Sequence, residues 1–253
     1  MKHHQRIWIL LVFIIVACAP KQEQARSPHW TYEGEEGPEH WGDLDPSYAV
    51  CSDGKSQSPI DVSNPSEKDL TNIVFHYEAS AVNILNNGHT VQVNYDAGSD
   101  IELDTVRYEL LQFHYHAPSE HVIDGKSFPA EIHLVHKNAE GGLAVIGILL
   151  EEGNENSAFD PFMNHLPTEK SEVQDAGVTI KVHEFLPVIQ TTFRYSGSLT
   201  TPPCTEGVSW LLMTMPVGLS AEQLSKLESI FEDGNNRPVQ PLNERPLDED
   251  SSP

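Results

Sequence analysis

The chain has 253 residues, with 15 Lys and Arg against 38 Asp and Glu, a formal net charge of −23 and an isoelectric point near 4.7. This balance argues against nucleic acid and anionic lipid headgroups as partners of the folded surface, because both are bound mainly by positively charged Lys and Arg side chains. It is not the composition of a disordered chain, since 38% of the residues are hydrophobic. A chain of this length can form a single all-β domain.

The first residues predict an export signal. Lys2 and Arg6 precede an apolar run over residues 7–17, which as a helix would span about 16 Å, short of a ~30 Å hydrocarbon core. Residues 15–18, Ile-Val-Ala-Cys, resemble the lipobox of bacterial lipoproteins, in which cleavage precedes a cysteine that carries lipid. We expect a signal peptide over residues 1–17 and lipidation of Cys18. An ordinary cleaved signal with an incidental cysteine is the alternative.

The cysteine content is consistent with export. The sequence contains three cysteines, Cys18, Cys51 and Cys204, and thiols tend to pair in an oxidising compartment. If Cys18 carries lipid, Cys51 and Cys204 remain as an even pair. Two buried free thiols are the alternative. The predicted location is the periplasmic or cell-surface side of a bacterial membrane, with membrane contact only through the lipid at Cys18.

The rest of the chain is predicted to form one domain between two irregular ends. Residues 18–37 contain proline and glycine without a sustained apolar period, which indicates a tether between anchor and domain. Residues 247–253 are acidic and are expected to form a solvated tail. No linker, repeat or change of composition interrupts residues 38–246, which we take as the domain.

Short β-strands dominate this domain. Residues 80–85 and 90–95 flank the pair Asn87-Gly88, which is typical of a hairpin because both residues tolerate positive φ. Four other runs have the composition of strands, at residues 109–116, 130–136, 143–151 and 208–215.

One helix is expected after these strands. Ser220 can cap it, Gln223 can complete a capping box, Leu224 and Leu227 begin an apolar stripe, and Gly234 can end it. The pattern predicts a mainly β (α+β) fold, a single domain around a large, mostly antiparallel twisted sheet with short peripheral helices.

Histidines alternate with apolar residues in the third strand. The alternation of a strand places Gln112, His114 and His116 on one face. The intervening residues, beginning with Leu111, are expected on the opposite face, where they can pack into a core. Two histidines at i and i+2 can reach one metal ion. Two cavity-facing histidines hydrogen-bonded to their neighbours are the alternative.

The next strand offers a third histidine. Glu131, His133 and Val135 share one of its faces. If this strand lies beside the previous one, His133 completes a set of three imidazoles, which suits Zn²⁺ and leaves one tetrahedral position for water. Gln112 and Glu131 each lie two residues before a histidine, where they could accept its second ring N–H.

These motifs resemble the signature of the α-class carbonic anhydrases. It includes residues 112–116 (QFHYH), 119–121 (SEH) and 130–136 (AEIHLVH). Further matching segments lie at residues 40–42, 57–61, 85–89, 195–203 and 237–242. They occur in family order, and their compact spacing resembles the exported bacterial branch, whose members also place cysteines where Cys51 and Cys204 stand.

The resemblance implies an enzyme that hydrates carbon dioxide reversibly to bicarbonate and a proton by means of a zinc-bound hydroxide. His114, His116 and His133 correspond to the zinc ligands. Thr200 corresponds to the hydroxyl that accepts the proton of the hydroxide and donates its own to Glu120.

The resemblance also implies a substrate site. The apolar wall that accepts carbon dioxide corresponds to Val135, Val145, Leu199, Val208 and Trp210. Thr201 corresponds to a residue that helps to hold bicarbonate, and Gln92 to a polar wall position. Ordinary β-core residues and, for Gln92, a solvent-facing strand residue are the alternatives.

His89 corresponds to the histidine that shuttles protons between the site and the buffer. A turn histidine facing solvent is the alternative. Asp43 is taken to stand near the position where many animal members carry a tyrosine that orders the waters of proton transfer. His121 and His136 are expected to be structural.

Other functions are compatible with parts of the pattern. A non-catalytic zinc-binding or recognition lipoprotein of the same fold is the main alternative, and zinc sequestration and ester hydrolysis are two others. The presence of Thr200 and Glu120 beside three ligand positions favours the enzyme. A homodimer is also compatible with the sequence.

Overall fold

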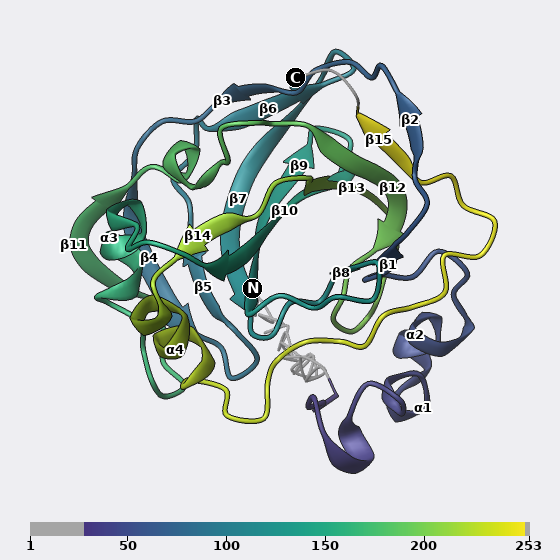
Figure 1. Ribbon diagram of the computed structural model, residues 1–253. Helices are drawn as coiled ribbons and strands as arrows, with labels where there is room; N and C mark the ends of the chain where they lie inside the picture. The colour runs from purple at the N-terminus through teal and green to yellow at the C-terminus, as the bar shows by residue number, and fades with distance from the viewer. Residues whose placement is uncertain (1–27, 251–253) are drawn as a thin grey trace, which may run out of the picture.

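A twisted 13-stranded sheet runs through the computed structural model, which describes residues 28–250 (Figure 1). The predicted signal peptide, Cys18 and the last three residues lie outside this range. The main path of the sheet is, in spatial order, β11 (Gln174–Ile180), β4 (Ser80–Asn86), β5 (Val91–Asn94), β7 (Val106–His116), β9 (Ala130–Asn138), β10 (Leu143–Glu152), β13 (Glu206–Met213), β12 (Thr192–Ser198), β15 (Asp248–Asp250) and β2 (Ser66–Lys68).

Most neighbouring strands are antiparallel, as predicted. The parallel pairs within this sheet are β10 with β13, β10 with β14 (Val217–Leu219), and β15 with β2. At one edge β3 (Val74–His76) pairs with β6 (Asp100–Leu103), which pairs with β7. A separate parallel pair joins β1 (Asp61–Val62) to β8 (Val122–Ile123). The expected strand at 208–215 ends at Met213, and the chain then enters β14.

The helices are short and peripheral (Figure 1). They are α1 (Trp41–Leu44), α2 (Val50–Asp53), α3 (Asp160–Met163) and α4 (Ala221–Glu228), with 3₁₀ turns η1 (Gly34–Glu36), η2 (Pro46–Tyr48), η3 (Ser157–Phe159) and η4 (Val182–Phe185). The predicted capping box of α4 is present, since Ser220 and Gln223 bond each other's backbone. The helix ends at Glu228, however, before the expected Gly234.

The two faces of the sheet contact different apolar clusters because side chains alternate along each strand. On β13, Leu211 and Met213 belong to the large cluster that also contains Phe113. Val208 and Trp210 belong to a second cluster. One face of the sheet therefore packs on the large cluster, and the other face packs on the second cluster, which lies beside the histidines.

The prediction that Leu111 packs into the core is wrong. A β-bulge lies between Leu110 and Gln112, so Leu110 pairs with His136 and Gln112 with Val135. The extra residue, Leu111, is 41% exposed, whereas Leu110 is 1% exposed. A bulge shifts the alternation by one residue, and it leaves Gln112 in the register of the histidine face.

The predicted hairpin between β4 and β5 is confirmed, with a different role for its asparagine. Gly88 has a φ of +93°, as such a turn requires. Asn87 instead accepts hydrogen bonds at its side-chain oxygen from the backbone N–H groups of His89 and Thr90, at 2.8 and 2.9 Å. These bonds fix the backbone of His89.

Both ends of the described chain pack on the domain, in contrast to the tether and tail that the sequence suggests. The hydroxyl of Tyr48 donates to the carbonyl of Pro28, and Trp30 packs against Trp41. At the other end β15 pairs with β12, and Asp250 accepts a hydrogen bond from Arg194 at 3.0 Å. Composition does not reveal these contacts because aromatic and ionic partners far along the chain make them.

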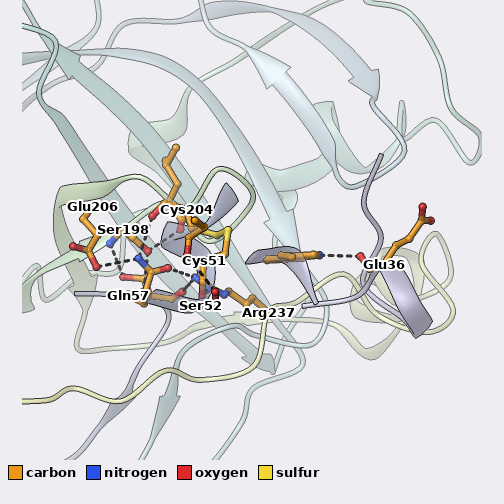
Figure 2. The surroundings of a disulfide bond; sticks show 12 residues. Glu36, Cys51, Ser52, Gln57, Ser198, Cys204, Glu206 and Arg237 are labelled. Atoms are coloured by element: carbon orange, nitrogen blue, oxygen red, sulfur yellow. Dashed lines mark hydrogen bonds between the residues drawn. A yellow bond between two sulfur atoms is a disulfide. The ribbon is translucent and has the colours of Figure 1, made fainter. Parts of the chain in front are cut away.

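The predicted pairing of Cys51 with Cys204 is present as a disulfide (Figure 2). It joins α2 to the turn between β12 and β13, across 153 residues of sequence. Both cysteines are buried with Trp41 and Tyr48 in a small cluster. The bond therefore attaches the N-terminal helices to the loop between β12 and β13.

We expect Cys51→Ser to lower the melting temperature without changing the metal content of the folded protein. Closing a loop of this length contributes up to about 5 kcal/mol in the chain-entropy account. Thermal unfolding and elemental analysis of the same samples measure both quantities. The wild type in reductant is the matched control and should melt with the variant. An unchanged melting temperature would contradict the expectation.

Candidate metal centre

Three histidines from two neighbouring strands converge on one point. His114 and His116 lie on β7, and the pairing of β7 with β9 sets His114 directly opposite His133. Their ring centroids lie 4.7 to 5.2 Å apart. One nitrogen of each ring lies within 4.8 Å of the other two. This spacing is compatible with a shared metal ion.

Hydrogen bonds to the second ring nitrogens determine which nitrogens face that point. His114 Nδ1 lies 2.9 Å from Gln112 Oε1, and His116 Nδ1 lies 2.6 Å from the carbonyl of Asn235. His133 Nε2 lies 2.8 Å from Glu131 Oε1. Since a neutral imidazole donates from one nitrogen and accepts at the other, His114 and His116 offer Nε2, and His133 offers Nδ1.

The chemistry of this donor set fits a divalent transition metal. His116 Nε2 is buried and has no hydrogen-bond partner within residues 28–250. Burial lowers the pKa of His116 to about 4 and that of His114 well below its usual range, and it also lowers the pKa of His133. All three rings are therefore neutral near pH 7, the form that binds zinc.

Glu131 joins the site to buried structure behind it. Its Oε1 also lies 2.7 Å from Nδ1 of His121, and its Oε2 accepts the backbone N–H groups of Glu120 and His121 at 3.0 and 2.8 Å. Burial opposes its ionisation, but His121 and His133 hold the pKa of Glu131 well below its usual range. His121 continues to the hydroxyl of Tyr195 at 2.7 Å, as expected of a structural histidine.

A second carboxylate, Glu120, lies beside the converging nitrogens of His116 and His133. Its Oε2 is 3.5 Å from His116 Nε2 and 3.9 Å from His133 Nδ1. Its Oε1 accepts the backbone N–H of Arg237 at 2.8 Å. Burial raises the pKa of Glu120 to about 7, against the opposing effects of His133, Arg237 and the hydroxyl of Thr200. Thr200 is itself buried beside this carboxylate.

The residues of the expected apolar wall come together in one cluster on this face of the sheet. Val145, Val208 and Trp210 are buried in it, and Val135 and Leu199 pack against it. The Trp210 ring lies 4.8 Å from that of His133. The five side chains thus belong to one apolar cluster, which contacts the histidines through Trp210 and His133.

The two expected polar residues lie on different segments, Gln92 on β5 and Thr201 in the turn between β12 and β13. Gln92 stands on β5 directly opposite His114, half-buried, and donates to Asn94 Oδ1 at 2.6 Å. Thr201 follows Thr200, and its carbonyl accepts the N–H of Cys204 at 2.8 Å. Within residues 28–250, neither residue makes a hydrogen bond to one of the three histidines.

His89 lies in the turn between β4 and β5. Its ring stacks on that of Trp30, with centroids 3.7 Å apart and planes 11° apart. Both line a cavity of about 700 Å³ together with His29. Partial burial, then the charges of Lys170 and His29, lower the pKa of His89 to about 4. The stacked ring is therefore neutral near pH 7.

Tyr32 was not predicted as a residue of the site, whereas Asp43, which was singled out from the sequence, is exposed on α1. Tyr32 packs against Trp41, and its buried hydroxyl has no hydrogen-bond partner in the described part of the chain. Burial and the charge of Glu120 raise the pKa of Tyr32 well above its usual value. A tyrosine therefore faces the site from residues 28–37, which the sequence suggested to be tether. The signal was the aromatic pair Trp30 and Tyr32 just before the motif at 40–42.

Asn235 is a second residue that the sequence analysis missed. Its carbonyl accepts a hydrogen bond from His116 Nδ1, and its Oδ1 accepts the backbone N–H of Ala117. Its Nδ2 donates to the carbonyls of His89 and Tyr115. It therefore attaches the turn at His89 to β7. Its place just before the matching segment at 237–242 was the available signal.

Comparison with known proteins places the chain in a family. A family model for eukaryotic-type carbonic anhydrase matches residues 36–250. A carbonic anhydrase of Pectobacterium atrosepticum is 43% identical over 219 residues, covering 87% of this chain and 90% of that protein. One from Nostoc sp. is 41% identical over 235 residues, covering 90% of this chain and 89% of that protein.

Solved structures agree. The α-carbonic anhydrase of Thermovibrio ammonificans, in complex with the inhibitor sulfanilamide, has a TM-score of 0.85 at 42% identity, covering 88% of this chain and 99% of that one. A hyperthermostable carbonic anhydrase identified from a hydrothermal vent chimney has a TM-score of 0.84 at 47% identity, covering 87% and 99%. The chain belongs to the eukaryotic-type, or α-class, carbonic anhydrase family, and it is an enzyme that interconverts carbon dioxide and bicarbonate.

Metal binding should depend on the residue behind each ligand. We expect Gln112→Leu to weaken zinc binding by about tenfold or more, since loss of an orienting partner typically costs 10- to 100-fold. Competition with a chromophoric chelator measures the affinity. Gln92→Leu is the matched control, because Gln92 stands opposite His114 without bonding it. Equal affinities in the two variants would contradict the orienting role of Gln112.

Proposed function

We propose that His114, His116 and His133 hold the Zn²⁺ on which the hydration of carbon dioxide depends. The observation that supports this most directly is the convergence of three neutral imidazole nitrogens, one of them buried without a partner in the described chain. When bound, zinc lowers the pKa of a water ligand to about 7 and so supplies hydroxide; carbonic anhydrase is the standard example of this value, which we adopt.

Thr200 and Glu120 are proposed to act on protons at this site. Glu120 accepts the hydroxyl proton of Thr200, which leaves the Thr200 oxygen as an acceptor toward the centre of the site. A group that carries a proton is then favoured there over an anion that has none. Thr201 is proposed to help hold bicarbonate beside it, with Gln92 on the polar wall.

The apolar cluster is proposed to receive carbon dioxide. Carbon dioxide has no charge and no proton to donate, so an uncharged wall can bind it without competing for the hydrogen bonds of Thr200. Val135, Val145, Leu199, Val208 and Trp210 form this wall. Bicarbonate, which is charged, is poorly solvated there, and this favours its release.

The non-catalytic alternative predicts that zinc binds but carbon dioxide is not hydrated. We expect activity to be lost on removal of zinc with a chelator, to return when zinc is added, and to be absent in His116→Ala. Hydration is measured by stopped-flow spectroscopy with a pH indicator. A zinc-loaded wild type without activity, or full activity in His116→Ala, would contradict the proposal.

His89 is proposed to transfer protons between the site and the buffer. The stacked ring has a pKa of about 4, so near pH 7 it is in the neutral form that can accept a proton. We expect His89→Ala to lower turnover about tenfold or more in dilute buffer, since a positioned proton carrier contributes on the order of 10²-fold. Added imidazole should restore the rate. An equal loss at all buffer concentrations would contradict the role.

Export and lipid anchoring at Cys18 are also proposed, from the sequence of residues 1–18. Within residues 28–250, no helix is long and apolar enough to cross a membrane. We expect mass spectrometry of the membrane fraction to find a mature chain that begins at a lipid-modified Cys18. Cys18→Ala, expressed in the same cells, is the control and should not be modified. An unmodified N-terminus at another residue would contradict lipidation.

A further inference from the structure

Gln57 is a buried amide that joins two separate segments of the proposed site, which we call its first and second walls: the segment at Arg237 and the turn that contains Cys204. It is 3% exposed. Its Oε1 accepts from Nη1 of Arg237 at 2.9 Å, and its Nε2 donates to the carbonyl of Cys204 and to Oε1 of Glu206, both at 3.1 Å (Figure 2). One side chain thus uses its acceptor toward one wall and its donors toward the other.

The first wall carries Glu120. Arg237 is 1% exposed. Its guanidinium donates to Gln57 and, at 2.8 Å each, to the carbonyls of Ser58 and Cys51. The backbone N–H of the same residue donates to Glu120 Oε1 at 2.8 Å. The bonds to the guanidinium therefore help to fix the backbone that holds the carboxylate of Glu120.

The second wall carries Thr200. The N–H of Cys204 closes the turn onto the carbonyl of Thr201 at 2.8 Å. Cys204 has a φ of +56°, and a residue other than glycine keeps such a conformation only where its surroundings hold it. The disulfide and the bond from Gln57 to the Cys204 carbonyl supply that support.

We infer that Gln57 is a positioning residue that sets Thr200 against Glu120 by holding Cys204 and Arg237 at once. The inference rests on the proposed function, in which the Thr200–Glu120 pair selects groups that carry a proton. A carboxylate at this position would lose both donors, and an alkyl chain would lose donors and acceptor and leave the partners buried without their bonds.

The test compares Gln57→Met with Gln223→Met. Gln223 is 5% exposed and also makes three hydrogen bonds, with Asn156 N, Asn156 O and the N–H of Ser220, at the α4 cap. Both variants should lose stability to a similar degree. We expect only Gln57→Met to lower kcat/KM for hydration, by about tenfold or more, since misplacement of about 1 Å can cost on the order of 10²-fold.

Inhibitor binding provides a readout that general destabilisation would not move. A bound sulfanilamide anion keeps an N–H proton to give to Thr200, whereas thiocyanate has none. With zinc-loaded Gln57→Met we expect sulfanilamide to bind about tenfold more weakly, the loss of roughly one charged hydrogen bond, and thiocyanate to bind as before. Parallel weakening of both ligands would overturn the inference.

Hydrogen exchange tests the contacts without metal or activity. In metal-free Gln57→Met, the backbone amides of Arg237 and Cys204 should exchange faster than in Gln223→Met. Unchanged exchange at both amides would by itself overturn the role of Gln57. An inactive zinc-loaded wild type would instead overturn the proposed function, so the two failures are distinguishable.

Discussion

The pairing of β7 with β9 is the constraint on which the site depends. β7 can present two histidines from its own alternation, but the third arrives only because the register sets His133 opposite His114. A slip of one residue would turn His133 to the opposite face. The apolar residues between them prevent that slip, since Phe113 pairs with Leu134 and both are buried. The core of one face therefore fixes the chemistry of the other.

Burial acts on two carboxylates near this register, but the pKa of Glu131 is lowered and that of Glu120 is raised, because the charges and hydrogen bonds of their neighbours differ. Glu131 receives two backbone N–H groups and two imidazoles, which favour its ionised form despite burial. Glu120 receives one backbone N–H, from Arg237, and burial keeps its pKa near 7. Glu131 is thus suited to support a cationic metal through His133, and Glu120 to share a proton with a hydroxyl.

The sequence predicts what depends on alternation and misses what depends on distant contacts. Period-two patterning was enough for the strands, the histidine face and Glu131 behind His133, because each follows from neighbours along one strand. The prediction for Leu111 was wrong because a bulge depends on how two strands pair, which the sequence of one strand does not show. Trp30 and Tyr32 were assigned to a tether because their partners, His89 and Trp41, are folded against them by tertiary structure that composition does not encode.

The same distinction separates the parts of the site by rigidity. The proposed ligands lie on central strands, where the backbone ladder fixes them, whereas the groups proposed to handle protons, Thr200 and His89, lie on irregular segments. Backbone outside a sheet must be held by side chains. Asn235 does this for His89, whose carbonyl it bonds while its own carbonyl receives His116, and Gln57 holds the turn after Thr200. Two buried carboxamides therefore extend the rigidity of the sheet to the loops that complete the site.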